Sequence, residues 1–157
     1  MPRKYKSTEA YLKPDVRYNS RMVSKFINNI MKDGKKSVAE RIFYNAMDIV
    51  EKKITDVPPL DVFTTAINNL KPIMEVRSRR IGGANYQIPM EVPKKRQLSL
   101  AMRWLLQAAR SKKGRPMSEK LADEIIAAYK KEGAAIKYRE NVHKMAEANK
   151  AFSHFNW

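Results

Sequence analysis

The sequence predicts a mainly α-helical protein, a single bundle of about six helices with one β-hairpin inserted at residues 73–92. Three observations predict this fold. Apolar residues recur every three or four positions along most of the 157-residue chain, which is the period of an amphipathic helix. Between residues 73 and 92 the period shortens to two, the period of a strand. Gly82-Gly83 divides that stretch, and paired glycines suit a hairpin turn that needs positive φ.

The first nineteen residues show no clean period and contain two prolines. Residues 1–19 are therefore interpreted as a flexible basic N-terminal arm that becomes ordered on binding. Ser20 is a suitable N-cap for the first helix, which should end at Asp33-Gly34. The apolar face of this helix consists of Val23, Phe26, Ile27, Ile30 and Met31.

A second helix is predicted to open at Ser37 and to run to about Ile54. The third begins near Pro58-Pro59, because proline is tolerated in a first helical turn. It should stop just before Pro72, since the residue that precedes a proline disfavours helical geometry.

Helical spacing resumes after the hairpin, from Pro93 to about Ala108. A basic loop follows at residues 111–116. Ser118 is the predicted cap of a fifth helix, which Gly133 would close, and apolar residues between 136 and 152 suggest a sixth. No linker is long enough to separate domains, so residues 1–157 are expected to form a single domain.

Charge is the strongest indication of function. The chain has 32 Lys and Arg against 16 Asp and Glu, a net charge of +16. The excess lies in residues 1–36, with ten basic and three acidic side chains, and in residues 71–115, with twelve and two. Such an excess indicates a polyanionic partner, nucleic acid first and an anionic membrane surface second. Its clustering favours a defined docking face.

Composition argues against an enzyme, a cofactor or a metal site. The chain has no cysteine, and its two histidines, His143 and His154, have a spacing that fits no zinc motif. No phosphate-binding or dinucleotide-binding glycine motif is present. Asp123-Glu124 is interpreted as a solvated carboxylate pair rather than an acid/base pair. No apolar run would span a bilayer and no secretory signal is found, so a cytoplasmic location is expected.

Two basic motifs stand out. Residues 77–80 place three arginines near the hairpin tip, where planar guanidinium groups suit phosphates and bases. Lys94-Lys95-Arg96 opens the fourth helix, where each cation costs about 0.3–1 kcal/mol against the helix dipole unless a phosphate binds there. Basic turns at residues 32–36 and 112–115 add to both clusters. The alternative is that these charges only solvate the surface and protect a sheet edge.

Several of these segments resemble the family of the seventh small-subunit ribosomal protein, in its bacterial form. The resemblance covers nearly all of residues 20–157 and departs from the family pattern at Tyr138, where a basic residue is expected. The residues that carry it are Glu75-Val76-Arg77-Ser78-Arg79-Arg80-Ile81-Gly82-Gly83, Tyr86 to Val92, Lys25-Phe26-Ile27-Asn28, Met31, Asp33-Gly34-Lys35-Lys36, Ala39-Glu40, Ala101-Met102-Arg103-Trp104-Leu105, and the ending from Arg139 to Phe152.

The resemblance implies a structural component of the small ribosomal subunit that binds its rRNA directly at a multi-helix junction of the head. It implies that binding helps the head domain to fold, and that the hairpin reaches tRNA in the exit site. The implied neighbours are the ninth and eleventh small-subunit proteins, and no small-molecule substrate is implied.

By matching position, the resemblance also implies which residues face RNA. The implied rRNA-binding residues are Arg3, Lys4, Lys35, Lys36, Arg77, Arg79, Arg80, Lys94, Lys95, Arg96, Lys112, Lys113 and Arg115. The implied tRNA-contact residues are Arg79, Arg80, Gly82, Gly83 and Tyr86.

Two alternatives from other classes stay open. A DNA-bending protein with a β-arm would share the basic hairpin, although such arms often carry an apolar wedge, whereas this tip is Gly-Gly flanked by arginines. An RNA-modifying enzyme is a distant third, because no catalytic set is evident.

Overall fold

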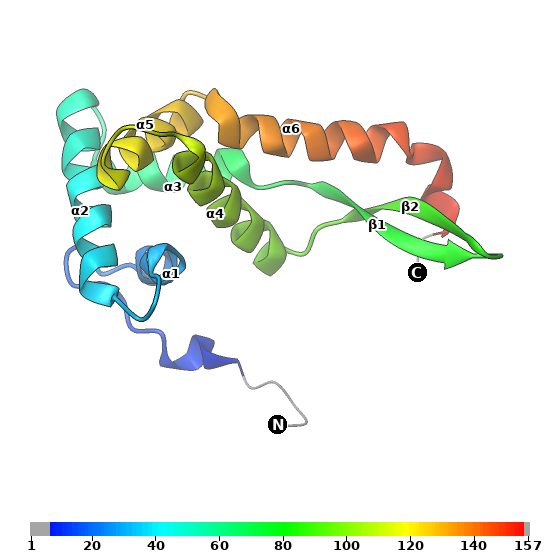
Figure 1. The fold of residues 1–157 in the computed structure, drawn as a ribbon, viewed down its shortest axis with the longest axis horizontal. Coiled ribbons are helices and arrows are strands. Elements are labelled where there is room, and N and C mark those ends of the chain that lie inside the picture. Colours follow the sequence, from blue (N-terminus) through cyan, green and yellow to red (C-terminus); the bar gives the residue numbers. More distant parts are fainter. Residues whose placement is uncertain (1–6, 156–157) are drawn as a thin grey trace.

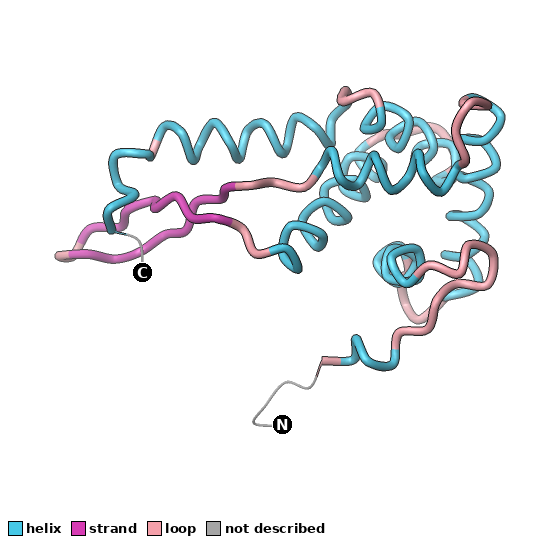
Figure 2. Tube along the Cα trace, turned by 180° about the vertical axis from the view of Figure 1, so that it is seen from behind, coloured by secondary structure: helices cyan, strands magenta, loops and turns pink. Residues whose placement is uncertain are grey.

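The computed structural model describes residues 7–155 and has the predicted fold class, a mainly α-helical protein with an inserted hairpin. The hairpin and α6 extend together from one side of the helical part (Figure 1), and Figure 2 shows the same arrangement from behind. In chain order the elements are η1 (Thr8–Tyr11), α1 (Arg21–Ile30), α2 (Lys36–Lys53), α3 (Pro59–Leu70), β1 (Met74–Ile81), β2 (Ala84–Glu91), α4 (Lys94–Ser111), α5 (Met117–Tyr129), α6 (Gly133–Ala148) and η2 (Lys150–Phe155).

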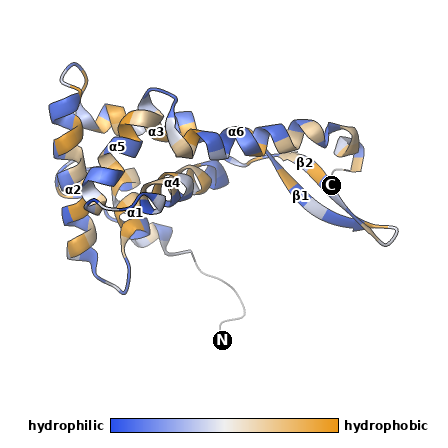
Figure 3. Ribbon diagram, turned by 45° about the horizontal axis from the view of Figure 1, so that its top comes forward, coloured by the Kyte–Doolittle hydropathy of each residue, from blue (hydrophilic) through white to orange (hydrophobic). Residues whose placement is uncertain are grey.

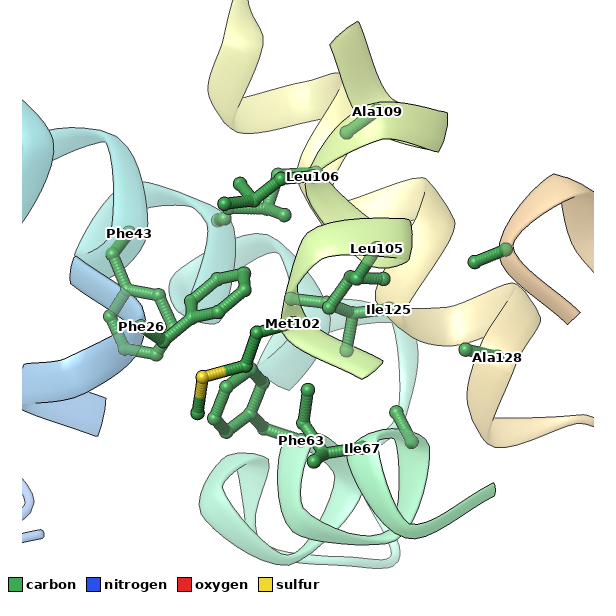
Figure 4. Close-up of a cluster of buried hydrophobic side chains, with 14 of the residues drawn as sticks. Phe26, Phe43, Phe63, Ile67, Met102, Leu105, Leu106, Ala109, Ile125 and Ala128 are labelled. Carbon is green, nitrogen blue, oxygen red and sulfur yellow. The ribbon is translucent and has the colours of Figure 1, made fainter. Parts of the chain in front are cut away.

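The main hydrophobic core lies among α1 to α5, and the first turns of α6 close one side of it. At its centre the ring of Phe26 lies 5.8 Å from that of Phe43 and 5.1 Å from that of Phe63. Met102 of α4 packs beside these rings (Figure 4). Hydrophobic and hydrophilic residues alternate along the helical ribbons (Figure 3), as the helical spacing predicts. The core therefore holds α1 and α4 as fixed neighbours.

The observed helix starts agree with the predicted ones at α1 and differ from them at α2 and α5. Ser20 caps α1, because its hydroxyl accepts a hydrogen bond from the backbone N–H of Val23 at 3.4 Å. The predicted start at Ser37 is one residue late, and the predicted cap at Ser118 is wrong because Ser118 lies inside the helix. The helix α2 begins at Lys36 with no side-chain cap, and α5 begins at Met117 directly after an extended proline. The residue before each helix, Lys35 or Pro116, makes no side-chain capping hydrogen bond, so neither start has the serine cap that the sequence suggested.

The predicted closure of α5 by Gly133 is also wrong. The helix ends in a Schellman motif, with Lys131 in the left-handed region at φ 61°. The backbone N–H of Glu132 donates to the carbonyl of Ala127 at 2.8 Å, and that of Lys131 donates to Ala128 at 3.1 Å. Gly133 is instead the first residue of α6, at φ 92°.

The hairpin has the predicted strands and turn. Its antiparallel ladder runs from Met74 opposite Glu91 at the base to the turn Gly82-Gly83, whose residues have φ of 56° and 88°. At the base, the backbone N–H of Ile73 donates to Nε2 of His143 on α6 at 3.1 Å. A small second core also joins the base to α4 and α6. It consists of Val92, Leu100 and Trp104, with Tyr138 and Val142 packed against them.

That second core explains one departure from the family pattern. Tyr138 packs against both hydrophobic clusters, at the place where α6 leaves the helical part. An aromatic ring at this position gains apolar contact that a basic side chain would give up.

Residues 7–19 take a defined path in the structure, beside α1 and α2. Asp15 is buried, and its carboxylate accepts hydrogen bonds from the backbone N–H groups of Tyr18 and Ser20, each at 2.9 Å. The hydroxyl of Tyr44 donates to the same carboxylate at 3.2 Å. These hydrogen bonds attach the segment to the helices. That the arm is mobile in the free protein and becomes ordered on binding stays a prediction.

Candidate nucleic-acid interface

The polar side of α4 faces α1 across a groove, called here the α1–α4 groove. Two cations of α4, Arg103 and Arg110, are seven residues apart, about two helical turns, so they share one face. A hollow of about 350 Å³ lies in this groove. Its lining combines three cations with amide, hydroxyl and apolar groups and includes no carboxylate among the described residues. The lining residues are Lys25, Asn29, Ser99, Arg103, Leu106, Gln107 and Arg110.

Arg110 is held in the groove by the end of α1. Its Nη2 donates to the backbone carbonyls of Ile30 at 3.2 Å and Asn29 at 3.5 Å. Carbonyls at a helix C-terminus carry partial negative charge, which favours a cation there. The fold therefore fixes one positive charge of the groove in place.

The groove continues to the start of α4, where a carboxylate already lies between two lysines. Glu9 of η1 pairs with Lys95 and, at 3.7 Å, with Nζ of Lys25. The hydrogen bond and positive charge of Lys95 lower the pKa of Glu9 below its ordinary value. The three side chains also border a smaller hollow of about 210 Å³. This end of the groove thus accepts an oxyanion in the structure itself.

The three basic residues that open α4 differ in their surroundings. Lys94 and Lys95 are exposed at the helix start. Arg96 reaches back to β1, where its Nε lies 2.7 and 2.9 Å from the two carboxylate oxygens of Glu75. That hydrogen bond raises the pKa of Arg96, and Glu75 is only 7% exposed. Arg96 therefore attaches the hairpin to α4, and acidic partners offset part of the dipole cost expected for this cluster.

The hairpin arginines lie on two faces of the ribbon, Arg77 and Arg79 on one and Arg80 on the other. Arg77 pairs with Glu75 at 3.3 Å, near the base. Arg79 lies opposite Tyr86 in the ladder, and residues directly opposite share a face of the ribbon. Arg80, next along the strand, lies on the other face and is exposed. The three arginines therefore do not form one cluster.

Tyr86, an implied tRNA-contact residue, packs within the molecule. Its ring centroid lies 5.3 Å from that of Phe152 and 5.7 Å from that of Phe155. The turn residues Gly82 and Gly83 have open space where a Cβ would lie. The tip is thus accessible to a partner backbone, whereas the tyrosine ring supports the C-terminal segment.

The turn between α1 and α2 lies close to the end of α4. Lys35 and Arg110 line the same hollow, of about 370 Å³, together with Met117 at the start of α5. The structure thus brings the predicted Lys35 beside the α1–α4 groove, although the two cations are 75 residues apart in the sequence. Lys36 is exposed on the first turn of α2.

The interpretation of Asp123-Glu124 as a solvated pair is wrong. Glu124 is 1% exposed, and its Oε1 accepts a hydrogen bond from the backbone N–H of Ala135 at 2.9 Å. Its other oxygen pairs with Lys112 at 2.9 Å. Asp123 pairs with Arg115 at 2.9 Å and with Lys53 at 2.7 Å, and the hydrogen bond from Lys53 lowers its pKa.

These contacts divide the implied rRNA-binding residues. Lys112 has a structural partner in Glu124, whereas Lys113 is exposed on the loop. Arg3 and Lys4 lie outside the described residues. The groove cations Lys25, Arg103 and Arg110 are absent from the implied set. The sequence does contain a signal for them. Each lies on the polar side of a predicted helix, opposite the apolar residues that the core buries, and Arg103 and Arg110 are spaced to share one face of theirs.

No group of three or more potential metal ligands occurs within residues 7–155. His143 accepts the hydrogen bond from Ile73, and burial lowers its pKa, which favours the neutral ring that accepts it. None of the described helices is long and apolar enough to cross a membrane.

Comparison with known proteins gives a consistent result. The family model described as "Ribosomal protein S7p/S5e" matches residues 2–150. A protein of Kosmotoga olearia named "Small ribosomal subunit protein uS7" is 55% identical, over 99% of both chains. Proteins of the same name are 54% identical in Desulfatibacillum aliphaticivorans, over 100% of both chains, and 52% identical in Thermotoga maritima, over 99% of both.

Proposed function

Because the chain belongs to the ribosomal protein S7p/S5e family, and is therefore a structural, non-enzymatic protein of the small ribosomal subunit, we propose that it binds small-subunit rRNA directly through the α1–α4 groove. The observation that carries this proposal is a concave surface with cations on both walls, Lys25 from α1 and Arg103 and Arg110 from α4. Glu9, which pairs with two lysines at one end, occupies a position that suits a phosphate oxygen.

The mechanism is neutralisation of phosphates at a fixed geometry. RNA helices that meet at a junction repel one another, and a rigid array of cations lowers that repulsion. The side chains would recognise the junction mainly by its shape, because the deep major groove of A-form RNA is closed to them. Binding would thereby favour the folded junction and help to nucleate folding of the head domain. Exposed Lys35, Lys36, Lys94 and Lys113 extend the array beyond the groove.

The first test is binding of the purified protein to a head-junction fragment of small-subunit rRNA, in competition with tRNA and with duplex DNA. We expect tight binding to the junction fragment that survives an excess of either competitor. Equal binding to all three would contradict shape recognition and leave only the general attraction of a basic protein. Preference for duplex DNA would favour the DNA-bending alternative.

The hairpin is proposed to contact tRNA near the exit site, through Arg80 and the open turn at Gly82-Gly83. Deletion of residues 79–84 should leave affinity for the junction fragment within about twofold, because the groove cations stay in place. Occupancy of exit-site tRNA on reconstituted small subunits should fall. Loss of junction binding in the deletion variant would contradict this division of roles.

The ninth and eleventh small-subunit proteins are proposed as neighbours, in line with the family resemblance. A surface suited to a protein neighbour lies between the hairpin base and α6, where Ile73 and Met145 expose large apolar side chains. A nearby hollow of about 410 Å³ includes Ile73, Pro89 and His143 in its lining.

A further inference from the structure

The hairpin has unequal support along its length. Its inner half is held by buried Ile88, by the contact of Glu75 with Arg96, and by the hydrogen bond from Ile73 to His143. Farther out, residues 77–80 of β1 are exposed. A two-stranded ribbon without packing on one face is marginal in water. Something other than the helical core must therefore keep the outer half in a defined position.

The chain itself provides a contact there, through its C-terminal helix η2. At the end of α6, the side chain of Asn149 donates to the carbonyl of Met145 at 2.8 Å. The backbone N–H of Phe152 then donates to the carbonyl of Asn149 at 3.0 Å, which turns the chain into η2. Figure 1 shows this last segment folded back from the end of α6 toward the outer part of the hairpin.

The segment η2 touches both strands at one level of the ladder. The rings of Phe152 and Phe155 pack on Tyr86 of β2, and the two phenylalanine rings stack at 6.5 Å. From β1, Nη1 of Arg79 donates to the backbone carbonyl of Phe155 at 2.9 Å. Because Arg79 and Tyr86 are cross-strand partners, these contacts bind the two strands to one segment.

We propose that η2 is a brace that fixes the position of the outer hairpin, with Phe152 and Phe155 as its positioning residues. The helix α6 joins the hairpin at the base through His143, and η2 joins it again near the tip. The tip residues Arg80, Gly82 and Gly83 then project at a set angle from the helical part. This inference rests on the proposed tRNA contact only for its functional consequence.

The test is amide hydrogen exchange of the full-length free protein carrying Phe152→Ala and Phe155→Ala together. Amides of residues 77–81 and 84–87 should exchange on the order of tenfold faster, because the ring contacts that oppose local opening are lost. Amides of α1 to α5 should keep their rates. Unchanged exchange in the outer hairpin would overturn the proposal.

Matched variants separate positioning from a general loss of structure. Lys144→Ala shortens an exposed side chain of α6 outside the aromatic cluster and should leave hairpin exchange unchanged. Phe152→Tyr with Phe155→Tyr keeps both rings and should restore slow exchange, and Tyr86→Phe should behave like the unaltered protein. Failure of the ring-retaining variants to restore slow exchange would refute ring packing as the cause.

A second readout keeps this inference distinct from the proposed function. The alanine pair should bind the junction fragment normally but lower exit-site tRNA occupancy, as deletion of the tip should. Fast hairpin exchange with normal tRNA occupancy would support the brace and refute the proposed tRNA contact. Slow exchange with lowered occupancy would refute the brace alone.

Discussion

Replacing Lys25, Lys95 and Arg103 together with alanine should lower affinity for the head-junction RNA by about two to three orders of magnitude at about 0.1 M salt. All three side chains border the α1–α4 groove or its extension at the start of α4. Each lost phosphate contact should also reduce the slope of log affinity against log salt by about 0.7–0.9, so the slope should fall by about two to three. A salt series of binding isotherms measures both effects.

The control must remove the same net charge elsewhere. Lys52, Lys137 and Lys144 are exposed on α2 and α6, outside the linings of the groove and its extension. Their triple alanine variant should lose only a small part of the affinity, through the general field of the protein, and keep most of the salt slope. Equal losses in the two triple variants would contradict a defined docking face.

Two residues that the resemblance implies as RNA-binding should be left out of such a series. Arg96 neutralises Glu75, and Lys112 neutralises Glu124, and both carboxylates are buried. Removing either cation leaves a buried carboxylate without that partner and lowers the stability of the fold. A loss of RNA binding in those variants could come from a lost phosphate contact or from a less stable fold. Variants of Lys25 and Arg103 do not have this ambiguity, because neither residue pairs with a buried carboxylate.

Local patterns were sufficient to predict much of the fold. The change to period two predicts the two strands of the hairpin, and the glycine pair predicts its turn. Both signals are local, because they lie within about twenty residues of sequence. The cap at Ser20 was predictable for the same reason. The start at Lys36 has no side-chain cap, and the start at Met117 follows Pro116 rather than a capping serine, so both starts lie before the predicted positions.

Contacts between distant segments were not predictable. The tRNA contact of Tyr86 comes from the family resemblance, and nothing in its own strand indicates that the rings of Phe152 and Phe155 pack on its ring. The burial of Glu124 depends likewise on the return of α6 to the end of α5. A charged residue on a lysine-rich helix resembles a solvated one until its partners are known. The sequence therefore predicts the positive charge of the candidate site and the segments that carry it. The role of each residue depends on which side chains lie next to it in the folded structure.

The other large effect concerns stability, at the junction between α5 and α6. A Cβ added to Gly133 would lie 2.9 Å from Cβ of Ala127 and 2.9 Å from Oε1 of Glu124. That oxygen caps α6 by accepting the N–H of Ala135, and the same carboxylate pairs with Lys112. Gly133→Ala must therefore displace either a helix or a buried carboxylate, in addition to placing alanine at φ 92°.

Gly114→Ala is the matched comparison, because Gly114 has φ 80° and a Cβ added there would have nothing within 4 Å. That variant should lose about 1–2 kcal/mol of unfolding free energy, the cost of left-handed backbone for a residue with a Cβ. Gly133→Ala should lose about 2 kcal/mol more, because the cap and ion pair of Glu124 are disrupted. Urea denaturation monitored by circular dichroism measures the difference. Equal losses at the two glycines would show that Glu124 adapts to the added methyl group, and that its contacts contribute little to holding α6 against the bundle.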